Sequence, residues 1–165
     1  MMRSRAGQRN GDRKHPRRLD AALYGIPDWP VSVTFRATSG HTLTEATVVD
    51  ALIGAMRYCS RRWQCRVAAY CIMPDHLHVL VVPEASSARA DQWVRYFKGR
   101  TAHALGRAGM WQRSYWDRHV RDEEGIVAVA EYILMNPVRR GLCAEWAEWP
   151  HSWSQWLPGA QRAPV

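Results

Sequence analysis

Two histidines separated by one residue, His76 and His78, stand in the otherwise apolar stretch HLHVLVV (76–82). Side chains alternate across a β-strand, so both imidazoles are expected on one face, about 7 Å apart along the chain. A divalent metal ion would satisfy both rings, because neutral imidazole is the most common metal ligand in proteins. Hydrogen bonds to backbone or carboxylate groups would satisfy them as well. The pair alone leaves both interpretations open.

Three kinds of histidine-based site fit the chain poorly. A histidine-triad hydrolase would need a third histidine at position 80, where the sequence has Leu80. A two-histidine phosphoesterase would need a second His-x-Ser/Thr element, and the sequence has none. A cupin-type metal site would need a further Glu and His in a larger, all-β chain.

A second pair of chemically interesting residues, Tyr132 and Asn136, occurs 54 positions after His78 in a segment with helical periodicity. Residues four apart lie on the same side of a helix. Gly125 and Ala128 lie on the same stripe and leave room for a large substrate. The pair offers a nucleophile and a third metal ligand, or alternatively a surface tyrosine and an asparagine that caps the helix before Pro137.

The hydrophobic pattern predicts the elements that position these residues. Strands are expected at 31–38, 66–73, 76–82 and 115–121, and helices at 43–62, at 87–105 and from an N-cap at Asp122 to Pro137. The order β-α-β-β-α-β-α predicts an α+β protein with a ferredoxin-like antiparallel sheet and helices packed on one face. The short turn at Pro74-Asp75 predicts an antiparallel hairpin.

The net charge of +8 is concentrated at the start of the chain, where the first 20 residues hold seven Lys or Arg and two Asp. This basic arm, residues 1–22, is expected to be flexible and to bind nucleic acid through its phosphates or to aid solubility. The N-terminus has no apolar segment of a secretory signal, and no apolar run is long enough to span a membrane. We therefore expect a cytoplasmic protein.

The four cysteines show no Cys-x-x-Cys pair and no metal-ligand spacing. They are expected to be small buried residues or bystander thiols. Residues 146–165 form a Trp-rich tail with no clear period. Trp146, Trp149, Trp153 and Trp156 are expected mostly to pack on the core, with DNA contact as the alternative.

Three motifs resemble the single-tyrosine HUH transposases, and most closely the REP-associated tyrosine transposases of bacteria. They are MPDHLHVLV (73–81), WQRSYWDRHVRDEE (111–124) and YILMNPVRRGL (132–142), and the resemblance covers roughly residues 30–142. It implies an HUH endonuclease-like domain over residues 23–145. Asp75 is a departure, since many relatives carry Asn at that turn.

The resemblance implies a metal-dependent enzyme that cleaves single-stranded DNA near hairpins through a covalent 5′-phosphotyrosine. In this interpretation His76, His78 and Asn136 bind the metal and Tyr132 is the nucleophile. Mixed nitrogen and oxygen ligands suit Mg²⁺ or Mn²⁺. The alternative is a domesticated, noncatalytic transposase that binds hairpin DNA, and a relaxase or replication initiator would need a longer chain.

Binding of single-stranded or hairpin DNA requires basic groups and aromatic rings. The candidates are Arg95, Lys98, Arg100, Trp111, Arg113, Arg118, Arg139 and Arg140. The target sequence, the general base for Tyr132 and the choice between a monomer and a homodimer stay open.

Overall fold

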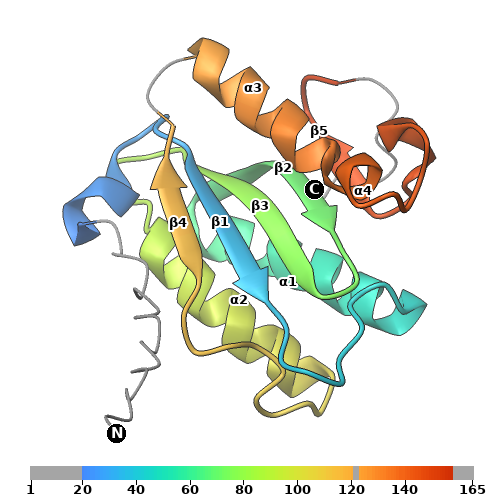
Figure 1. Ribbon diagram of the computed structural model, residues 1–165. Helices are drawn as coiled ribbons and strands as arrows, with labels where there is room; N and C mark the ends of the chain where they lie inside the picture. The colour runs from blue at the N-terminus through green and yellow to red at the C-terminus, as the bar shows by residue number, and fades with distance from the viewer. Residues whose placement is uncertain (1–19, 121–122, 158–165) are drawn as a thin grey trace, which may run out of the picture.

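A five-stranded antiparallel sheet forms the centre of the computed structural model, which describes residues 20–120 and 123–157 (Figure 1). The strand order is β4-β1-β3-β2-β5, so β3 lies at the middle of the sheet. The strands are β1 (Val31–Arg36), β2 (Cys65–Ile72), β3 (His76–Pro83), β4 (Trp116–His119) and β5 (Ser152–Ser154). The first four match the predicted strands to within three residues at each end.

Four α-helices and two short 3₁₀ helices complete the described part of the chain. They are η1 (Ala21–Gly25), α1 (Ala46–Trp63), α2 (Ala90–Ala104), α3 (Glu123–Leu134), α4 (Asn136–Arg139) and η2 (Trp146–Glu148). None of the described helices combines the length and the apolar character that a membrane crossing requires. The predicted N-cap Asp122 and most of the predicted basic arm, residues 1–19, lie outside the described residues.

The two faces of the sheet are covered by different helices, as Figure 1 shows. Helices α1 and α2 pack on the face that includes Leu77, Val79 and Val81 of β3. Helix α3 packs on the opposite face, against Leu80 and Val82 of the same strand. The α+β, ferredoxin-like class is confirmed, and the predicted one-face packing is correct only for α1 and α2. Helix α3 lies opposite because β2 and β3 are apolar on both faces.

Part of the Trp-rich segment forms the fifth strand of the sheet. Ser152–Ser154 forms β5 and pairs antiparallel with β2, where Trp153 lies opposite Tyr70. Trp153 packs against the core on the α1–α2 side, and Trp149 and Trp156 pack against the smaller core beneath α3. The indole nitrogen of Trp149 also donates a 3.0 Å hydrogen bond to the carbonyl of Ile72. The expected packing is confirmed for these three tryptophans.

Helix α3 ends earlier than predicted. It stops at Leu134, and Pro137 lies in the first turn of the separate helix α4, where proline needs no backbone donor. The side-chain nitrogen of Asn136 donates to the carbonyls of Tyr132, at 2.9 Å, and Ile133, at 3.1 Å. Asn136 thus caps the end of α3 and stays one turn beyond Tyr132, although the two residues belong to different helices.

Candidate active site

His76 and His78 lie side by side on the face of β3 that α3 covers. Their ring centroids are 4.7 Å apart and the ring planes are nearly perpendicular, at 86°. His76 is buried, and His78 is half-buried. The predicted placement on one strand face is confirmed by the burial of Leu77 and Val79 in the opposite layer.

The ring of His76 is held by the carboxylate of its neighbour in the β2–β3 turn. Its Nδ1 lies 2.6 Å from Oδ1 of Asp75, which also forms a 3.8 Å ion pair with Arg36. A carboxylate only accepts hydrogen bonds, so this contact places the ring proton on Nδ1 and leaves the Nε2 lone pair free to bind a cation. A carboxylate behind a histidine in this way is the common arrangement around metal ligands.

The ring of His78 is held from the neighbouring strand. Its Nδ1 lies 2.9 Å from the hydroxyl of Thr34, which is its direct partner in the pairing of β1 with β3. This contact also uses Nδ1, so both histidines are anchored by the same nitrogen. Nε2 is therefore the nitrogen that each ring would offer to a shared metal ion.

The surroundings of both imidazoles lower their pKa below the ordinary value for histidine. Burial lowers the pKa of His76, against the opposing effect of Asp75. Burial together with the charges of His76, Arg140 and Arg36 lowers the pKa of His78 to about 4. Metal binding near pH 7 needs neutral imidazoles, and a lowered pKa favours that form.

Tyr132 lies on α3, opposite His78 across the site. The two ring centroids are 6.4 Å apart, and Tyr132 is 50% exposed, so solvent and large substrates can reach it. The Arg139 guanidinium lies 4.3 Å from the tyrosine ring centroid and also donates to the Tyr132 carbonyl at 3.4 Å. Arg139 thus holds the ring and brings positive charge over its face.

Asn136 completes the group of predicted site residues. It is buried, and a hydrogen bond between its side chain and His78 is one of the interactions that set the pKa of that histidine. Its amide nitrogen is used by the two α3 carbonyls. All four predicted residues come from one chain and converge at one place.

The metal-binding interpretation depends on a mixed set of ligands. Within residues 20–120 and 123–157, no three His, Cys, Asp or Glu side chains are gathered to hold a metal ion. The donors present at the site are two imidazole nitrogens and one amide group, that of Asn136. Such a set fits a weakly held divalent ion with several open positions, and the contacts of Asp75 and Thr34 support the fit.

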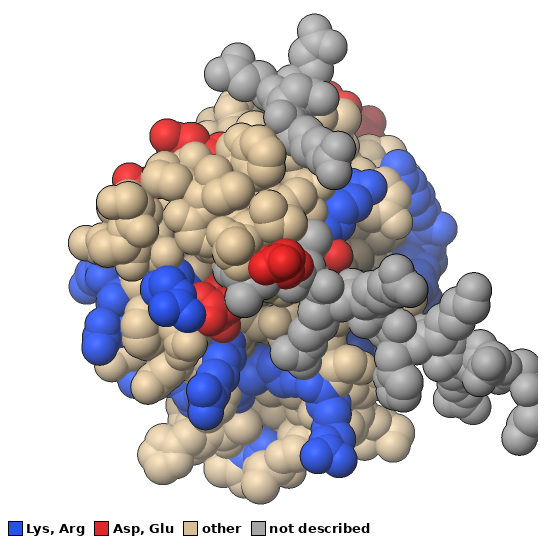
Figure 2. All heavy atoms as spheres, turned by 90° about the vertical axis from the view of Figure 1, so that its left-hand side faces the viewer, with Lys and Arg blue, Asp and Glu red and all other residues tan. Residues whose placement is uncertain are grey.

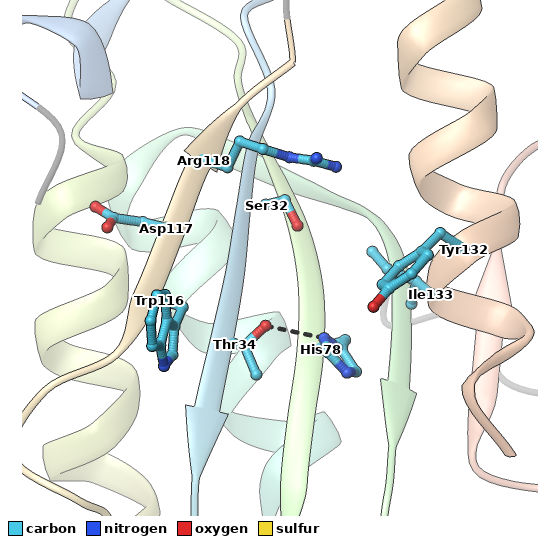
Figure 3. A pocket seen from close by; sticks show the side chains of 8 residues that line it. All are labelled: Ser32, Thr34, His78, Trp116, Asp117, Arg118, Tyr132 and Ile133. Carbon is cyan, nitrogen blue, oxygen red and sulfur yellow. Dashed lines mark hydrogen bonds between the residues drawn. The ribbon is translucent and has the colours of Figure 1, made fainter. Parts of the chain in front are cut away.

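A groove of about 650 Å³ opens beside these residues, between β4 and α3 (Figure 3). Its lining includes Thr34, His78 and Ile133, and Figure 3 shows the Tyr132 hydroxyl turned into it. Ser32, Trp116, Asp117 and Arg118 complete the lining from the side of β1 and β4. The groove is large enough for nucleotide-sized substrates and is open to solvent.

The predicted DNA-binding residues fall into two groups. Arg118 lines the groove, Arg139 contacts Tyr132, and Arg140 is close enough to affect both histidines. Arg95, Lys98 and Arg100 belong to α2, on the other face of the sheet. Figure 2 shows the side of the molecule with η1, α2 and β4, where Lys and Arg are spread over the lower half, with a further group at the upper right.

Some of these residues have structural contacts. The ammonium group of Lys98 donates to the carbonyls of Gln112 and Arg113 and so holds the loop before β4. The Arg100 guanidinium stacks over the ring of Tyr58 at 3.8 Å. Arg113 is exposed in the same loop. DNA binding by these residues stays a prediction.

Trp111 has a different position from the one predicted. Only 7% of it is exposed, its ring packs against Phe35 and Phe97, and its indole nitrogen donates to the Thr101 hydroxyl at 2.8 Å. No face of the ring is left for a base, so the structure contradicts a DNA contact through Trp111. A tryptophan that follows a loop gives no local signal of burial in the core.

Three residues of the site were not among the predicted set. Asp75 could have been found, since it directly precedes His76 and a carboxylate beside a ligand histidine is common. Thr34 is found only through the β1–β3 register, which the sequence does not encode locally. Trp116 was not distinguished from the other tryptophans, although it stands in an alternating strand with Arg118.

The chain has clear relatives among known proteins. It is 27% identical over 125 residues to the REP-associated tyrosine transposase of Escherichia coli K12, covering 75% of this chain and 74% of that protein. It is 30% identical over 99 residues to a putative REP-associated tyrosine transposase of Haemophilus influenzae, covering 51% of this chain and 56% of that protein.

A solved structure shares the fold. A REP-associated tyrosine transposase bound to a REP hairpin superposes with a TM-score of 0.72 at 22% identity, covering 84% of this chain and 81% of that one. The family model described as "Transposase IS200 like" matches residues 31–136, a range that begins with β1 and ends at Asn136. The match includes both histidines and Tyr132, and the chain therefore belongs to the IS200-like transposase family.

Proposed function

We propose that the protein cleaves and rejoins single-stranded DNA near hairpins, with Tyr132 as the nucleophile. The observation that carries this proposal is the position of Tyr132 beside His78, at 6.4 Å between ring centroids, on the edge of an open groove. A tyrosine that only served packing would not need to be half exposed beside two neutral, hydrogen-bonded imidazoles. The similarity to REP-associated tyrosine transposases supports the same reaction.

The proposed reaction exchanges one phosphate ester for another. The Tyr132 oxygen attacks the phosphorus, and the bond from phosphorus to the 3′ oxygen of the preceding nucleotide breaks. The tyrosine loses its proton, and the departing 3′ oxygen gains one. The product is a 5′-phosphotyrosine and a free 3′-OH, and attack of a 3′-OH on this ester restores the tyrosine and joins the strands without ATP.

His76, His78 and Asn136 are the residues that would hold Mg²⁺ or Mn²⁺. A divalent ion bound there would supply Lewis-acid polarisation of the scissile phosphate. The chain itself contributes two further functions. Asp75 and Thr34 fix the orientation of the two imidazoles, and Arg139 and Arg140 bring positive charge to the place where a phosphate would enter.

The proposed substrate is single-stranded DNA joined to a hairpin. The solved relative of the same fold is bound to a REP hairpin, and a net charge of +8 suits a phosphate-rich partner. One chain supplies all four site residues, which supports activity in a monomer. A homodimer would bring a second complete site and would not be required for chemistry.

The test is covalent capture of DNA by the purified full-length protein. Labelled hairpin DNA from repeats flanking the gene would be incubated with Mn²⁺ or Mg²⁺ and run on a denaturing gel. Tyr132→Phe is expected to abolish the protein-linked DNA band, and a chelator is expected to prevent it in the wild type. Tyr96→Phe is the matched control, because Tyr96 is equally exposed, at 49%, but lies on α2.

Each outcome separates the two candidate functions. A covalent band that needs Tyr132 and not Tyr96 would establish the strand-transfer enzyme. Tight binding of hairpins with no covalent product in either metal would instead support the noncatalytic DNA-binding protein. A band that survives in Tyr132→Phe would show that another residue is the nucleophile.

A further inference from the structure

Part of the sheet face that carries the two histidines is left open. The core beneath α3 is built from residues of β2, β3 and α3 together with Met73, Val120, Trp149 and Trp156, and it includes no residue of β1. The neighbouring positions of β1 on that face, Ser32 and Thr34, are polar and half-buried. These two residues form the floor of the groove between β4 and α3.

The strand register places one aromatic side chain in line with the histidine site. Thr34 pairs with His78 on one side and with Trp116 on the other, so the three residues form a row across β3, β1 and β4. Neighbouring strands are about 4.8 Å apart, which puts the backbone of Trp116 about 10 Å from that of His78.

Trp116 is unusually exposed for its size. It is 62% exposed, more than any other large hydrophobic side chain that the structure describes as exposed, and Tyr132 follows it at 50%. An indole ring that stays exposed in a groove does not contribute the favourable free energy that its burial would give to folding. The ring is available as a flat stacking surface, and base–aromatic stacking is the general means of binding single strands.

Arg118 stands two positions later on the same face of β4. It pairs with Ser32, in the next row of the sheet, and Figure 3 shows its side chain extending across the groove toward α3. A guanidinium binds phosphate through two parallel hydrogen bonds. The groove thus offers a ring and a cation side by side, next to Tyr132.

We propose that Trp116 and Arg118 form a subsite for the unpaired nucleotide next to the scissile phosphate, whose base stacks on Trp116 and whose phosphate binds Arg118. This proposal rests on the proposed function, and it names the part of the substrate that this groove takes. Arg118 favours single-stranded DNA as the occupant, since a second protein chain would need an acid opposite this cation. Trp116 is then a positioning residue for the strand, and it stays apart from the reacting atoms.

The test measures binding separately from chemistry. Full-length Tyr132→Phe protein would be titrated against a fluorescein-labelled 20-nucleotide single strand and against the same strand with abasic sites, both by anisotropy. Trp116→Ala is expected to weaken binding of the normal strand about tenfold, within the range known for stacked bases. It is expected to leave binding of the abasic strand unchanged. Trp116→Phe should lose no more than about threefold, because phenylalanine keeps an aromatic face.

Arg118→Gln tests the phosphate contact. It is expected to weaken binding of the normal strand and of the abasic strand by the same factor. It should also lower the slope of log affinity against log salt concentration by about 0.7, the value for one phosphate on a single strand. Trp116→Ala should leave that slope unchanged. Trp29→Ala is the matched control, an exposed tryptophan that contacts His119 and does not line the groove. Circular dichroism would confirm that each variant is folded.

The outcomes keep the two proposals apart. Equal loss on the normal and the abasic strand, or no loss at all, would overturn stacking on Trp116. A change of oligomeric state in Trp116→Ala without a change in DNA affinity would assign the ring to a protein interface. This result would also overturn the stacking proposal. The expected losses in affinity, with no covalent product from the wild type, would keep the subsite and reject the enzyme.

Discussion

The two faces of the central sheet use the same strand for opposite purposes. On the α1–α2 face, β3 contributes Leu77, Val79 and Val81 to a continuous core. On the other face, the same strand contributes His76 and His78 before it continues with Leu80. Alternation along one strand therefore places a packing layer on one side of the backbone and the candidate site on the other.

The helices cover the two faces to different extents, and this difference explains which face is open to a substrate. The α1–α2 layer is filled by aromatic rings in contact, such as Phe35, Trp93 and Phe97, with centroids 5.1 Å apart along the series. The α3 layer covers only part of its face and leaves the groove between β4 and α3. The rigid side holds β1 and β3 in register, and the register in turn holds Thr34 against His78. A site built this way depends on a core that it does not touch.

The difference between the two faces is tested most directly by truncating two neighbouring side chains of β3, one on each face. His78→Ala is expected to lower the yield of covalent DNA product at least about 100-fold, since even residues that only support a metal ligand cost 10–100-fold. It should change the melting temperature by only a few degrees. Leu77→Ala is expected to cost about 2–5 kcal/mol of unfolding free energy, roughly 5–15 °C in melting temperature.

Both variants would be followed by thermal unfolding and by the denaturing gel. The folded fraction of Leu77→Ala should keep nearly wild-type activity, because its side chain points to the other face. If His78→Ala kept its activity, or if the two variants lost stability alike, the division of labour between the faces would be wrong.

A smaller effect is expected from the residue that supports His76. Asp75→Ala removes the acceptor of the 2.6 Å contact and should lower product yield about 10–100-fold at fixed Mn²⁺ concentration. Asp75→Asn keeps an acceptor oxygen in place, so its product yield should fall only a few-fold. Arg36→Gln is the control, since its ion pair with Asp75 is exposed and worth little.

The measurement is product yield as a function of Mn²⁺ concentration for each variant. Asp75→Ala is expected to shift the midpoint to higher Mn²⁺, which a defect in DNA binding would not do. An Asp75→Asn variant as impaired as Asp75→Ala would mean that the negative charge matters and the acceptor alone does not suffice.

The sequence predicted which residues meet at the candidate site because the signals for them are local. The spacing of His76 and His78 fixes a common strand face, and the four-residue spacing of Tyr132 and Asn136 fixes a common side. Asn136 kept its place one turn beyond Tyr132 even though α3 ends at Leu134. A break in the helix at Met135 did not disturb the pattern, because Asn136 itself caps the carbonyls at the end of α3.

What the sequence could not predict depends on contacts between distant segments. The pairing of Thr34 with His78 follows from strand register, and the three residues of β5 are too few to show a period. Trp111 and Trp116 have the same chemistry and lie five positions apart, yet one is buried and the other is 62% exposed. The position of α3 follows from the apolar residues on both faces of β3, which require a covering layer on each face. The predicted packing on one face did not take this into account.

The smallest expected effect is a difference in the reactivity of cysteines that lie in the two layers. Burial raises the pKa of Cys59 to about 11 and that of Cys65 to about 12, and it raises that of Cys71 further still. In the native protein at pH 8 these three thiols should resist N-ethylmaleimide, whereas the partly exposed Cys143 should react within minutes. Cys59 and Cys65 report on the α1–α2 layer, and Cys71 lies beneath α3.

Low concentrations of guanidinium should therefore expose Cys71 before Cys59. The core beneath α3 is the smaller of the two and has the groove along one side, so local opening of α3 should need less free energy than global unfolding. Mass spectrometry of labelled peptides would give the rate at each site, and a Cys143→Ser variant would remove the fast background. Equal rates for Cys59 and Cys71 at every denaturant concentration would mean that both layers open as one unit. The groove beside the candidate site would then follow from the shape of the fold alone, with no difference in stability between the two layers.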